Sequence, residues 1–572
     1  ASLLHPPSRS SARFYTASTH SGRSDRLLSA PVSALPDKPD LTHSGIRAYL
    51  LDGRARYENS PPHGWAEGRQ DILDLTRRAS YKTCYAGPIA LTGLRHSLLG
   101  AELNPSAELV NKLWRLCAVL RKDGITYPQY VSELTYLLFL KMMKETGREE
   151  GLVPVGLRWI DLITCPPDRS LDHYRTMLSN LGDPSKGAHV AVIRIFGGAT
   201  TVLRDPRNLQ MLTDAIDRMA WFSEGEDRFG DIYEGLLQKN AEETKRGAGQ
   251  YFTPRVIIDL IVEILKPSSG EIVQDPAAGT GGFLVSSVRA ARRNGQDVKV
   301  SGMENVQDTY RLLLMNLYLH GIGDEEVHLG DTLSDDSRKL GRPDIILTNP
   351  PFGPAGGRPT RSDLAITGNV ASYQLPFVEH CIDALSPGGR AAIVIPDNVL
   401  FEGGRALALR QKLMDRCELH TILRLPTGIF YAAGVRTNVL FFNKGTDAGP
   451  GTSETWIYDL RANMQAFGKT APITDTDFAD FVASYGSDRN GHAKRTDKGE
   501  DGRFRRFTRD EISARDDSLD ISWLMDDSLG FEASLENPDD IALAILDHLR
   551  AAVQQIEALA EDVESSSARE TV

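Results

Sequence analysis

The most distinctive chemistry in the chain lies in four consecutive residues, Asn349, Pro350, Pro351 and Phe352. The aliphatic run just before them, Ile345–Thr348, predicts a strand that is buried on both faces. Neither proline can donate a backbone N–H to a sheet, so this strand ends at Asn349. A carboxamide, two rigid prolines and an aromatic ring then stand at the carboxyl end of a strand, where open α/β sheets bind ligands. We therefore expect the active site at this edge.

A glycine-rich turn follows the first predicted strand of the same region. The residues of this turn that we expect to face a ligand are Asp275, Ala277, Gly279, Thr280, Gly281 and Gly282. Glycines at a strand-to-helix turn allow positive φ angles and a close approach of the backbone to a ligand. The spacing differs from the G-x-G-x-x-G of dinucleotide enzymes, and the chain has no G-x-x-x-x-G-K-[ST] phosphate loop. The turn therefore favours a smaller nucleoside cofactor, although such a turn also occurs without any ligand.

Two acidic residues follow the next two predicted strands. Glu304 ends the strand at 298–303, and an acid there can accept hydrogen bonds from both hydroxyls of a ribose. Asp331 comes after the strand at 327–329 and could accept from the amino group of an adenine. Each acid alone is equally explained as a solvated loop carboxylate or a helix cap. Their occurrence at consecutive strand ends favours binding of a nucleoside.

A third motif precedes the glycine-rich turn and consists of Gln250, Tyr251, Phe252, Thr253, Pro254 and Arg255. It leads into a predicted helix at 255–265, with Thr253 as the expected N-cap and Pro254 in the first turn. The two aromatic residues could also form a wall of the cofactor site. We therefore assign this motif to cofactor binding, alongside its capping role.

The elements that must position these motifs alternate between short aliphatic runs and helical patterns. The predicted strands are 271–274, 298–303, 327–329, 345–348, 391–395, 419–423 and 439–442, and helices fill the intervals. This alternation predicts an α/β fold with a doubly wound, mostly parallel sheet. The short connection around 427–434 allows one of the last two strands to run antiparallel.

The remainder of the chain divides into distinct segments. A length of 572 residues exceeds one hydrophobic core, so we expect two folded domains and tails. The expected segments are a weakly ordered extension at 1–106, a helical domain at 107–245, the sheet domain at 246–485, and a charged linker with a C-terminal helix at 486–572. The apolar stripe of that last helix packs either on its own chain or on another subunit's helices.

Composition limits the possible partners. The net charge of −12 argues against a chain that coats nucleic acid by itself, so any DNA contact is local or shared with a partner. No segment approaches the about 20 apolar residues of a membrane span. The five cysteines are scattered, which argues against a disulfide framework or a zinc site and fits a cytoplasmic protein. We predict no metal.

The motifs at 250–255, 275–283 and 349–352, in this order, resemble those of the S-adenosylmethionine-dependent N6-adenine DNA methyltransferases. More narrowly, they resemble the modification subunit of type I restriction-modification systems, from about Leu109 to the C-terminus. The resemblance implies a Rossmann-like methyltransferase sheet, S-adenosyl-L-methionine as cofactor and double-stranded DNA as substrate. It also implies a DNA-specificity subunit, a second copy of this chain and a restriction (helicase-nuclease) subunit as partners.

Two other functions stay open at this point. The Asn-Pro-Pro-[Phe/Tyr] tetrad also occurs in methyltransferases that act on protein glutamine or RNA, and a scaffold could bind the cofactor without catalysis. For the adenine reaction, the Asn349 side-chain oxygen and the Pro350 carbonyl would accept hydrogen bonds from the N6 amine, while Pro351 fixes their geometry. Phe352 would stack on a base rotated out of the duplex. The competing interpretations are a turn role for Asn349 and a core role for Phe352.

Overall fold

The computed structural model describes residues 105–524, except 122–123, 220, 224–225, 228, 244–252, 324–325, 431–435, 446–450, 465–466 and 468–470. The expected C-terminal helix lies outside the described residues, as does the expected N-terminal extension apart from 105–106. None of the helices described in this range is long and apolar enough to span a membrane.

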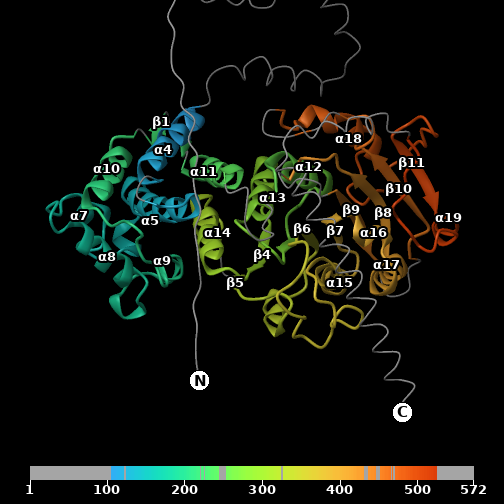
Figure 1. Ribbon diagram of the computed structural model, residues 1–572, viewed down its shortest axis with the longest axis horizontal. Helices are drawn as coiled ribbons and strands as arrows, with labels where there is room; N and C mark the ends of the chain where they lie inside the picture. The colour runs from blue at the N-terminus through green and yellow to red at the C-terminus, as the bar shows by residue number, and fades with distance from the viewer. Residues whose placement is uncertain are drawn as a thin grey trace, which may run out of the picture. The chain divides into compact units, whose positions relative to one another are not determined.

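The first part of the described chain is helical, as the sequence predicts (Figure 1). Helix α5 lies at its centre, and from Tyr130 to Met143 every residue except Ser132 is buried. A helix that is apolar nearly all round must be enclosed by others. The elements of this region are α4 (Pro105–Arg121), α5 (Tyr127–Glu145), α6 (Glu149–Leu152), α7 (Trp159–Ile163), α8 (Ser170–Leu181), η2 (Pro184–Lys186), α9 (Val190–Phe196), α10 (Pro206–Asp217), a ribbon of β1 (Phe222–Ser223) and β2 (Glu226–Asp227), and α11 (Phe229–Glu243).

The second part contains a nine-stranded sheet with the order β11-β10-β8-β9-β7-β6-β3-β4-β5. Its strands are β3 (Ile272–Asp275), β4 (Lys299–Glu304), β5 (Val327–Leu329), β6 (Ile345–Thr348), β7 (Arg390–Pro396), β8 (Cys417–Arg424), β9 (Thr437–Lys444), β10 (Glu454–Asp459) and β11 (Phe504–Thr508). Strands β3 to β7 pair in parallel, and β9 runs antiparallel to β7 and β8. The predicted mostly parallel sheet with an antiparallel late strand is confirmed.

Two strands of this sheet were not predicted. Strand β10 pairs in parallel with β8, and β11 pairs antiparallel with β10 at the edge of the sheet. In β11 only Phe504 is buried, and Arg505 and Arg506 follow it directly, so the apolar alternation that marks a strand is absent from its sequence. The charged stretch therefore holds an edge strand, and Leu519 and Ile521 beyond it are buried in a core of the sheet.

Helices cover both faces of the sheet. Side chains of β7 alternate between two cores, with Ala392 and Val394 in one and Ile393 and Ile395 in the other. This alternation requires cover on both sides, as a doubly wound sheet provides. The covering elements are α12 (Arg255–Leu265), α13 (Gly282–Arg293), α14 (Gln307–Leu319), η3 (Asp335–Leu340), α15 (Gln374–Ala384), α16 (Asn398–Phe401), α17 (Gly404–Arg416), η4 (Asp475–Phe478), α18 (Ala479–Tyr485) and α19 (Arg509–Ser513).

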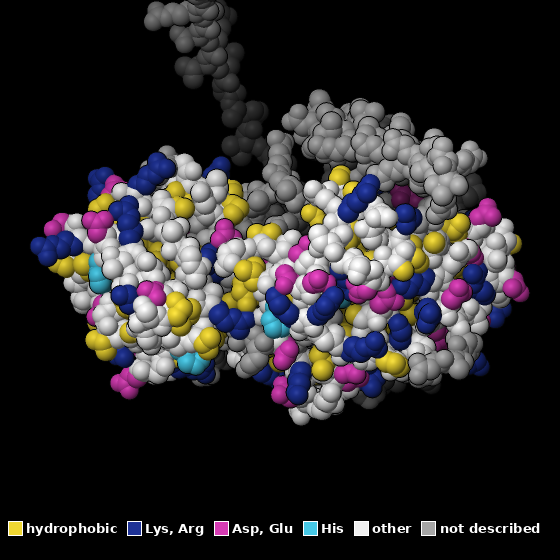
Figure 2. Space-filling model, turned by 90° about the horizontal axis from the view of Figure 1, so that it is seen from below, with side chains coloured by type: hydrophobic (Ala, Val, Ile, Leu, Met, Phe, Trp, Pro, Cys, Tyr) yellow, Lys and Arg dark blue, Asp and Glu magenta, His cyan; other side chains and the backbone are white. Residues whose placement is uncertain are grey.

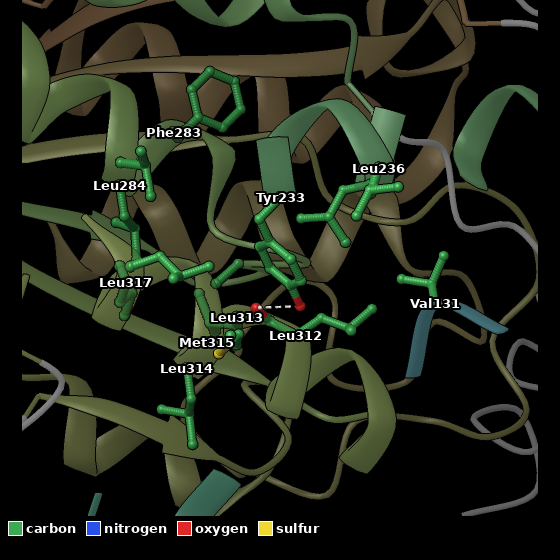
Figure 3. Close-up of a cluster of buried hydrophobic side chains, with 14 of the residues drawn as sticks. Val131, Tyr233, Leu236, Phe283, Leu284, Leu312, Leu313, Leu314, Met315 and Leu317 are labelled. Atoms are coloured by element: carbon green, nitrogen blue, oxygen red, sulfur yellow. Dashed lines mark hydrogen bonds between the residues drawn. The ribbon is translucent and has the colours of Figure 1, made fainter. Parts of the chain in front are cut away.

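Helix α14 joins the helical region to the sheet. Figure 3 shows Tyr233 and Leu236 of α11 gathered with the leucines of α14 and with Leu284 of α13, and the Tyr233 hydroxyl lies 3.5 Å from the Leu312 carbonyl oxygen. On the same helix, the buried guanidinium of Arg311 donates to the carbonyls of Ile195 (2.8 Å) and Gly197 (2.9 Å). The two regions therefore share one hydrophobic core.

Candidate active site

The site lies where the order of the parallel strands reverses. Strand β3 lies between β4 and β6, and the chain leaves its carboxyl end through α13 towards β4. Open α/β sheets form their binding crevice at such a point. The two predicted motifs meet here, because the Thr348 hydroxyl at the end of β6 donates to Asp275 Oδ1 at the end of β3, at 2.7 Å. The structure thus brings the glycine-rich turn and the Asn349 tetrad together.

Asn349 presents a free acceptor at this edge. Its Nδ2 donates to Thr253 Oγ1 at 2.9 Å, while its Oδ1 is buried and has no hydrogen-bond partner among the residues described. An unpaired buried carbonyl oxygen costs about 1–3 kcal/mol. In a turn, this oxygen would accept a hydrogen bond from a nearby backbone N–H. The arrangement instead leaves Oδ1 available to a donor that is not part of the described chain.

The rest of the tetrad is firmly held. Pro350 is buried, and Phe352 belongs to the larger core with 9% of its surface exposed. The N–H of Gly353 donates to Gln374 Oε1 of α15 at 3.0 Å, and Gly353 has a φ of +88° that favours glycine. Phe352 thus packs in the core, as the competing interpretation holds, and its predicted stacking on a base is not tested.

The glycines of the turn serve two different purposes. Gly279 and Gly281 both have left-handed backbones, with φ of +54° and +85°. A Cβ on Gly281 would lie 2.5 Å from Leu313 Cδ1, and one on Gly282 would lie 2.7 Å from Ile258 Cδ1, whereas one on Gly279 would meet no atom within 4 Å. Gly281 and Gly282 are therefore required for packing of α13. Gly279 faces open space, as a ligand cradle requires.

Glu304 lies at the end of β4, as predicted, and two backbone N–H groups hold its carboxylate, while its contact with a ribose stays a prediction. Its Oε2 accepts from the N–H of Gly279 (3.0 Å) and its Oε1 from the N–H of Val306 (2.8 Å). Burial raises the pKa of this carboxyl, and the backbone N–H groups oppose that rise. A carboxylate offers about four acceptor positions, so positions remain for further donors. Val306 and Leu329 beside it are apolar and 38% and 39% exposed.

Asp331 differs from Glu304, because it is exposed and its Oδ1 accepts from the N–H of Leu333 at 2.8 Å. This contact is the local turn that Asp residues commonly form. The neighbouring Thr332 is buried and donates to the Pro276 carbonyl at 2.6 Å, which ties the end of β5 to the glycine-rich turn. Asp331 therefore lies beside the predicted cofactor site, and its contact with an adenine stays a prediction.

Asp275 is the most perturbed acid of the site. Burial raises the pKa of its carboxyl to about 7, against the hydrogen bonds from the Thr348 hydroxyl and the Ala277 N–H, and the negative Glu304 adds to the rise. One carboxyl thus bonds to both the cofactor turn and the strand that carries Asn349.

The third motif is partly described. Gln250, Tyr251 and Phe252 lie outside the described residues, so the structure does not test their predicted role. The prediction that Thr253 caps the helix is wrong, since α12 begins at Arg255 with Pro254 as its N-cap and without a side-chain cap. The Thr253 hydroxyl accepts from Asn349 instead. Arg255 pairs with Glu234 (2.5 Å) and Asp259 (3.2 Å), so its charge is balanced inside the chain.

The described residues contain one cluster of metal-ligand type, formed by Asp231, Glu234 and His320. Arg289 Nη1 lies 2.9 Å from Asp231 and 3.2 Å from Glu234, and Arg255 also pairs with Glu234. Two guanidinium groups therefore already neutralise the two acids of this cluster.

Two residues that shape the site were missed by sequence reasoning. Thr348 bonds to Asp275, and Asn316 Nδ2 of α14 donates to the Thr280 carbonyl of the glycine-rich turn at 2.9 Å. A lone carboxamide within the apolar run of α14 is the signal that could have identified Asn316, because buried polar groups need partners. Nothing in the sequence marks Thr348 beyond its place next to Asn349.

Comparison with known proteins identifies the family of the chain. The family model described as N-6 DNA Methylase matches residues 224–528, a range that includes β11. The Type I restriction enzyme EcoKI methylase subunit of Escherichia coli (strain K12) is 45% identical over 512 residues, covering 80% of this chain and 96% of the relative. A solved structure from work on complex assembly and conformational transition of the type I R-M system is 26% identical, with a TM-score of 0.58, and covers 80% of this chain and 98% of that chain.

The fold agrees as well. The type I restriction-modification system methyltransferase subunit from Streptococcus thermophilus has a TM-score of 0.59 at 21% identity, covering 73% of this chain and 98% of that chain. The predicted Rossmann-like sheet, the family and the enzyme class, an adenine-specific DNA methyltransferase, are thus confirmed. The chain belongs to the N-6 DNA methylase family, as one of the methylase subunits of type I restriction enzymes.

Proposed function

We propose that this chain transfers a methyl group from S-adenosyl-L-methionine to the N6 amine of an adenine rotated out of double-stranded DNA. The observation that carries the proposal is the unpaired, buried Oδ1 of Asn349 at the switch point of the sheet. An adenine N6 amine has two hydrogens to donate and lacks a free lone pair, because that pair is delocalised into the ring. Acceptors at its hydrogens, Asn349 Oδ1 and the Pro350 carbonyl, would hold the nitrogen closer to tetrahedral.

The chain's own residues fit the cofactor. Gly279 leaves room beside the turn, and Glu304 keeps acceptor positions for the two ribose hydroxyls. The exposed apolar side chains of Val306 and Leu329 would flank the adenine ring. When bound, S-adenosyl-L-methionine supplies an electrophilic methyl group on a sulfonium. The remaining predicted contacts are those of Asp275, Ala277, Thr280, Asp331 and the 250–255 motif.

Catalysis in this arrangement depends on positioning. Effective alignment of two reacting groups supplies about 7–11 kcal/mol in well-oriented systems. The prolines at 350 and 351 fix the backbone that carries the acceptors, and Phe352 is packed in the larger core with 9% of its surface exposed. Rotating the base out of the duplex costs a few kcal/mol. Stacking on the exposed part of Phe352 would recover about 1–3 kcal/mol of that cost.

In this proposal, a separate DNA-specificity subunit selects the DNA site. On the face shown in Figure 2, Lys and Arg side chains are interspersed with Asp and Glu side chains, and the net charge of the chain is −12. Neutralising a duplex requires several phosphate contacts. We therefore place this chain beside a DNA-specificity subunit and a second copy of itself, with a restriction (helicase-nuclease) subunit joining for cleavage.

The test uses the chain purified together with the subunits encoded beside it. Transfer of labelled methyl from S-adenosyl-L-methionine is measured to DNA, RNA and protein, and the methylated base is identified by mass spectrometry. We expect N6-methyladenine in DNA, and loss of the product with Asn349→Ala while cofactor binding by calorimetry is retained. Methyl transfer to RNA or glutamine instead, or full DNA methylation by Asn349→Ala, would overturn the proposal.

A further inference from the structure

The Asn349 carboxamide has one donor end and one acceptor end, and among the described residues only the donor end has a hydrogen-bond partner. We propose that Thr253 is a positioning residue that pairs with Asn349 Nδ2 and so stabilises the orientation in which the carboxamide oxygen faces the target amine. This inference rests on the proposed function. Its basis is the 2.9 Å hydrogen bond from Asn349 Nδ2 to Thr253 Oγ1, together with the buried and unpaired Oδ1.

The orientation of the Asn349 carboxamide decides whether the side chain attracts or repels the target amine. The target N6 amine offers only hydrogens, so it requires the oxygen of the carboxamide. Rotation of the amide by a half-turn would direct the Nδ2 hydrogens of Asn349 at the amine hydrogens, and the two donors would repel. The oxygen and nitrogen of an amide have almost the same size, so packing does not distinguish the two orientations. A threonine hydroxyl can accept or donate, so it can bond to either end of the amide. Its effect comes with the target base in place: when Oδ1 accepts from the amine, Thr253 gives Nδ2 an acceptor, and without the hydroxyl Nδ2 would lose the partner that it has here.

Thr253 is well placed to hold the amide. Pro254, the next residue, fixes the start of α12, where its carbonyl accepts from the N–H of Ile257 at 3.0 Å and of Ile258 at 3.2 Å. Both isoleucines are buried, with at most 3% of their surface exposed. The first turn of α12 is thus anchored in the core, which fixes the position of Thr253 directly before the helix.

The missing helix cap supports the same conclusion. A threonine at this place in the sequence commonly bonds to the first N–H groups of the helix, which stabilises the helix by about 1 kcal/mol. Here α12 has no side-chain cap, and the Thr253 hydroxyl accepts from a residue 96 positions away. The Thr253 hydroxyl therefore bonds to Asn349 of the tetrad and not to the first N–H groups of α12.

The first test compares Thr253→Val with Thr253→Ser in the complete complex. Valine keeps the shape and loses the hydroxyl, and serine keeps the hydroxyl. We expect Thr253→Val to lower kcat by about threefold to tenfold, the range that corresponds to one neutral hydrogen bond, and Thr253→Ser to restore most of it. The KM for S-adenosyl-L-methionine should change less than kcat. Thr213→Val in α10, which removes a buried hydroxyl that bonds to the Leu209 carbonyl, serves as the matched control and should leave kcat unchanged.

A second test removes the need for orientation. In Asn349→Asp both ends of the side chain are oxygens, so a half-turn has no effect on the acceptor. Single-turnover rates with excess enzyme are measured for Asn349→Asp with and without Thr253→Val. We expect the loss caused by Thr253→Val to shrink below twofold in this background, because the two residues act through one interaction.

Other outcomes overturn the inference. If Thr253→Val keeps kcat within twofold of the wild-type complex, or changes only the KM for the cofactor, Thr253 does not position Asn349. An equal loss in the wild-type and Asn349→Asp backgrounds would also reject it, since additive effects indicate separate actions. Absence of N6-methyladenine in DNA with the wild-type complex would instead reject the proposed function, so the two failures are distinguishable.

Discussion

Asp275 should make the stability of the fold depend on pH in a definite direction. Burial raises the pKa of its carboxyl from 3.8 to about 7. Below pH 3.8 the carboxyl is protonated in both the folded and the unfolded chain, so it causes no loss of stability. Between about pH 4 and 7 the unfolded chain releases this proton while the folded chain keeps it. The contribution of Asp275 to stability is therefore lost as pH rises through this window.

The magnitude follows from the shift of the pKa. Each pH unit within the window removes about 1.4 kcal/mol of stability per retained proton. For Asp275 the loss amounts to roughly 2 kcal/mol at pH 5 and roughly 4 kcal/mol at pH 8. Asp275→Asn does not titrate, so it lacks this loss at every pH. The stability of the variant relative to the wild type should thus rise by roughly 2–3 kcal/mol between pH 5 and pH 8.

The assay is urea unfolding of the purified chain at both pH values, for the wild type and Asp275→Asn. The new amide also changes the hydrogen bonds with Thr348 and Ala277, but this cost is the same at both pH values and cancels in the comparison. Asp335→Asn, which exchanges an exposed acid in η3, is the matched control for the substitution. A free-energy difference between wild type and Asp275→Asn that is equal at pH 5 and pH 8 would refute the burial argument.

Two further substitutions test the packing around the site. Gly281→Ala should destabilise the fold by about 1–3 kcal/mol, because the left-handed backbone and the contact with Leu313 both oppose a Cβ. Gly279→Ala should destabilise the fold less, because its Cβ would meet no neighbouring atom within 4 Å. Equal unfolding midpoints for the two variants would contradict this difference. Arg311→Met should loosen the helical region from α14, since the carbonyls of Ile195 and Gly197 lose a charged donor worth about 1.5–3 kcal/mol each. Faster hydrogen exchange around residues 190–199, with exchange in β6 unchanged, is the expected readout, and unchanged exchange there would refute it.

The sequence predicted the parts of the fold that depend on local pattern. The seven predicted strands all occur, because runs such as Ile345–Leu347 are apolar without interruption, as strands covered on both faces are. Strand β11 escaped prediction because it is an edge strand whose Arg505 and Arg506 interrupt the apolar pattern. Its place in the sheet depends on pairing with β10, a contact across about fifty residues that no local pattern encodes.

The site was predictable in its motifs and not in its hydrogen bonds. The order of Asp275, Glu304 and Asn349 along successive strand ends placed them at one edge, since parallel strands share their carboxyl ends. The partner of Thr253 was not predictable, because a capping role and a tertiary contact have the same local sequence. The glycines show a similar limit. Sequence alone does not separate Gly279, which faces open space, from Gly281, which packs against Leu313.

The two hydrogen bonds that bracket Asn349 explain why its substitution is an informative test. Thr348 ties the end of β6 to Asp275, so the backbone of the tetrad stays anchored to β3 even without the Asn349 side chain. Truncation to alanine gives up one hydrogen bond to Thr253, about 0.5–1.5 kcal/mol, and also removes a buried unpaired oxygen that costs about 1–3 kcal/mol. These terms oppose each other, so the fold of Asn349→Ala should be about as stable as the wild type. The oxygen of Asn349 gains a hydrogen bond only when a donor binds beside it. Because the fold of Asn349→Ala should stay intact, a loss of methylation in this variant would result from the missing acceptor.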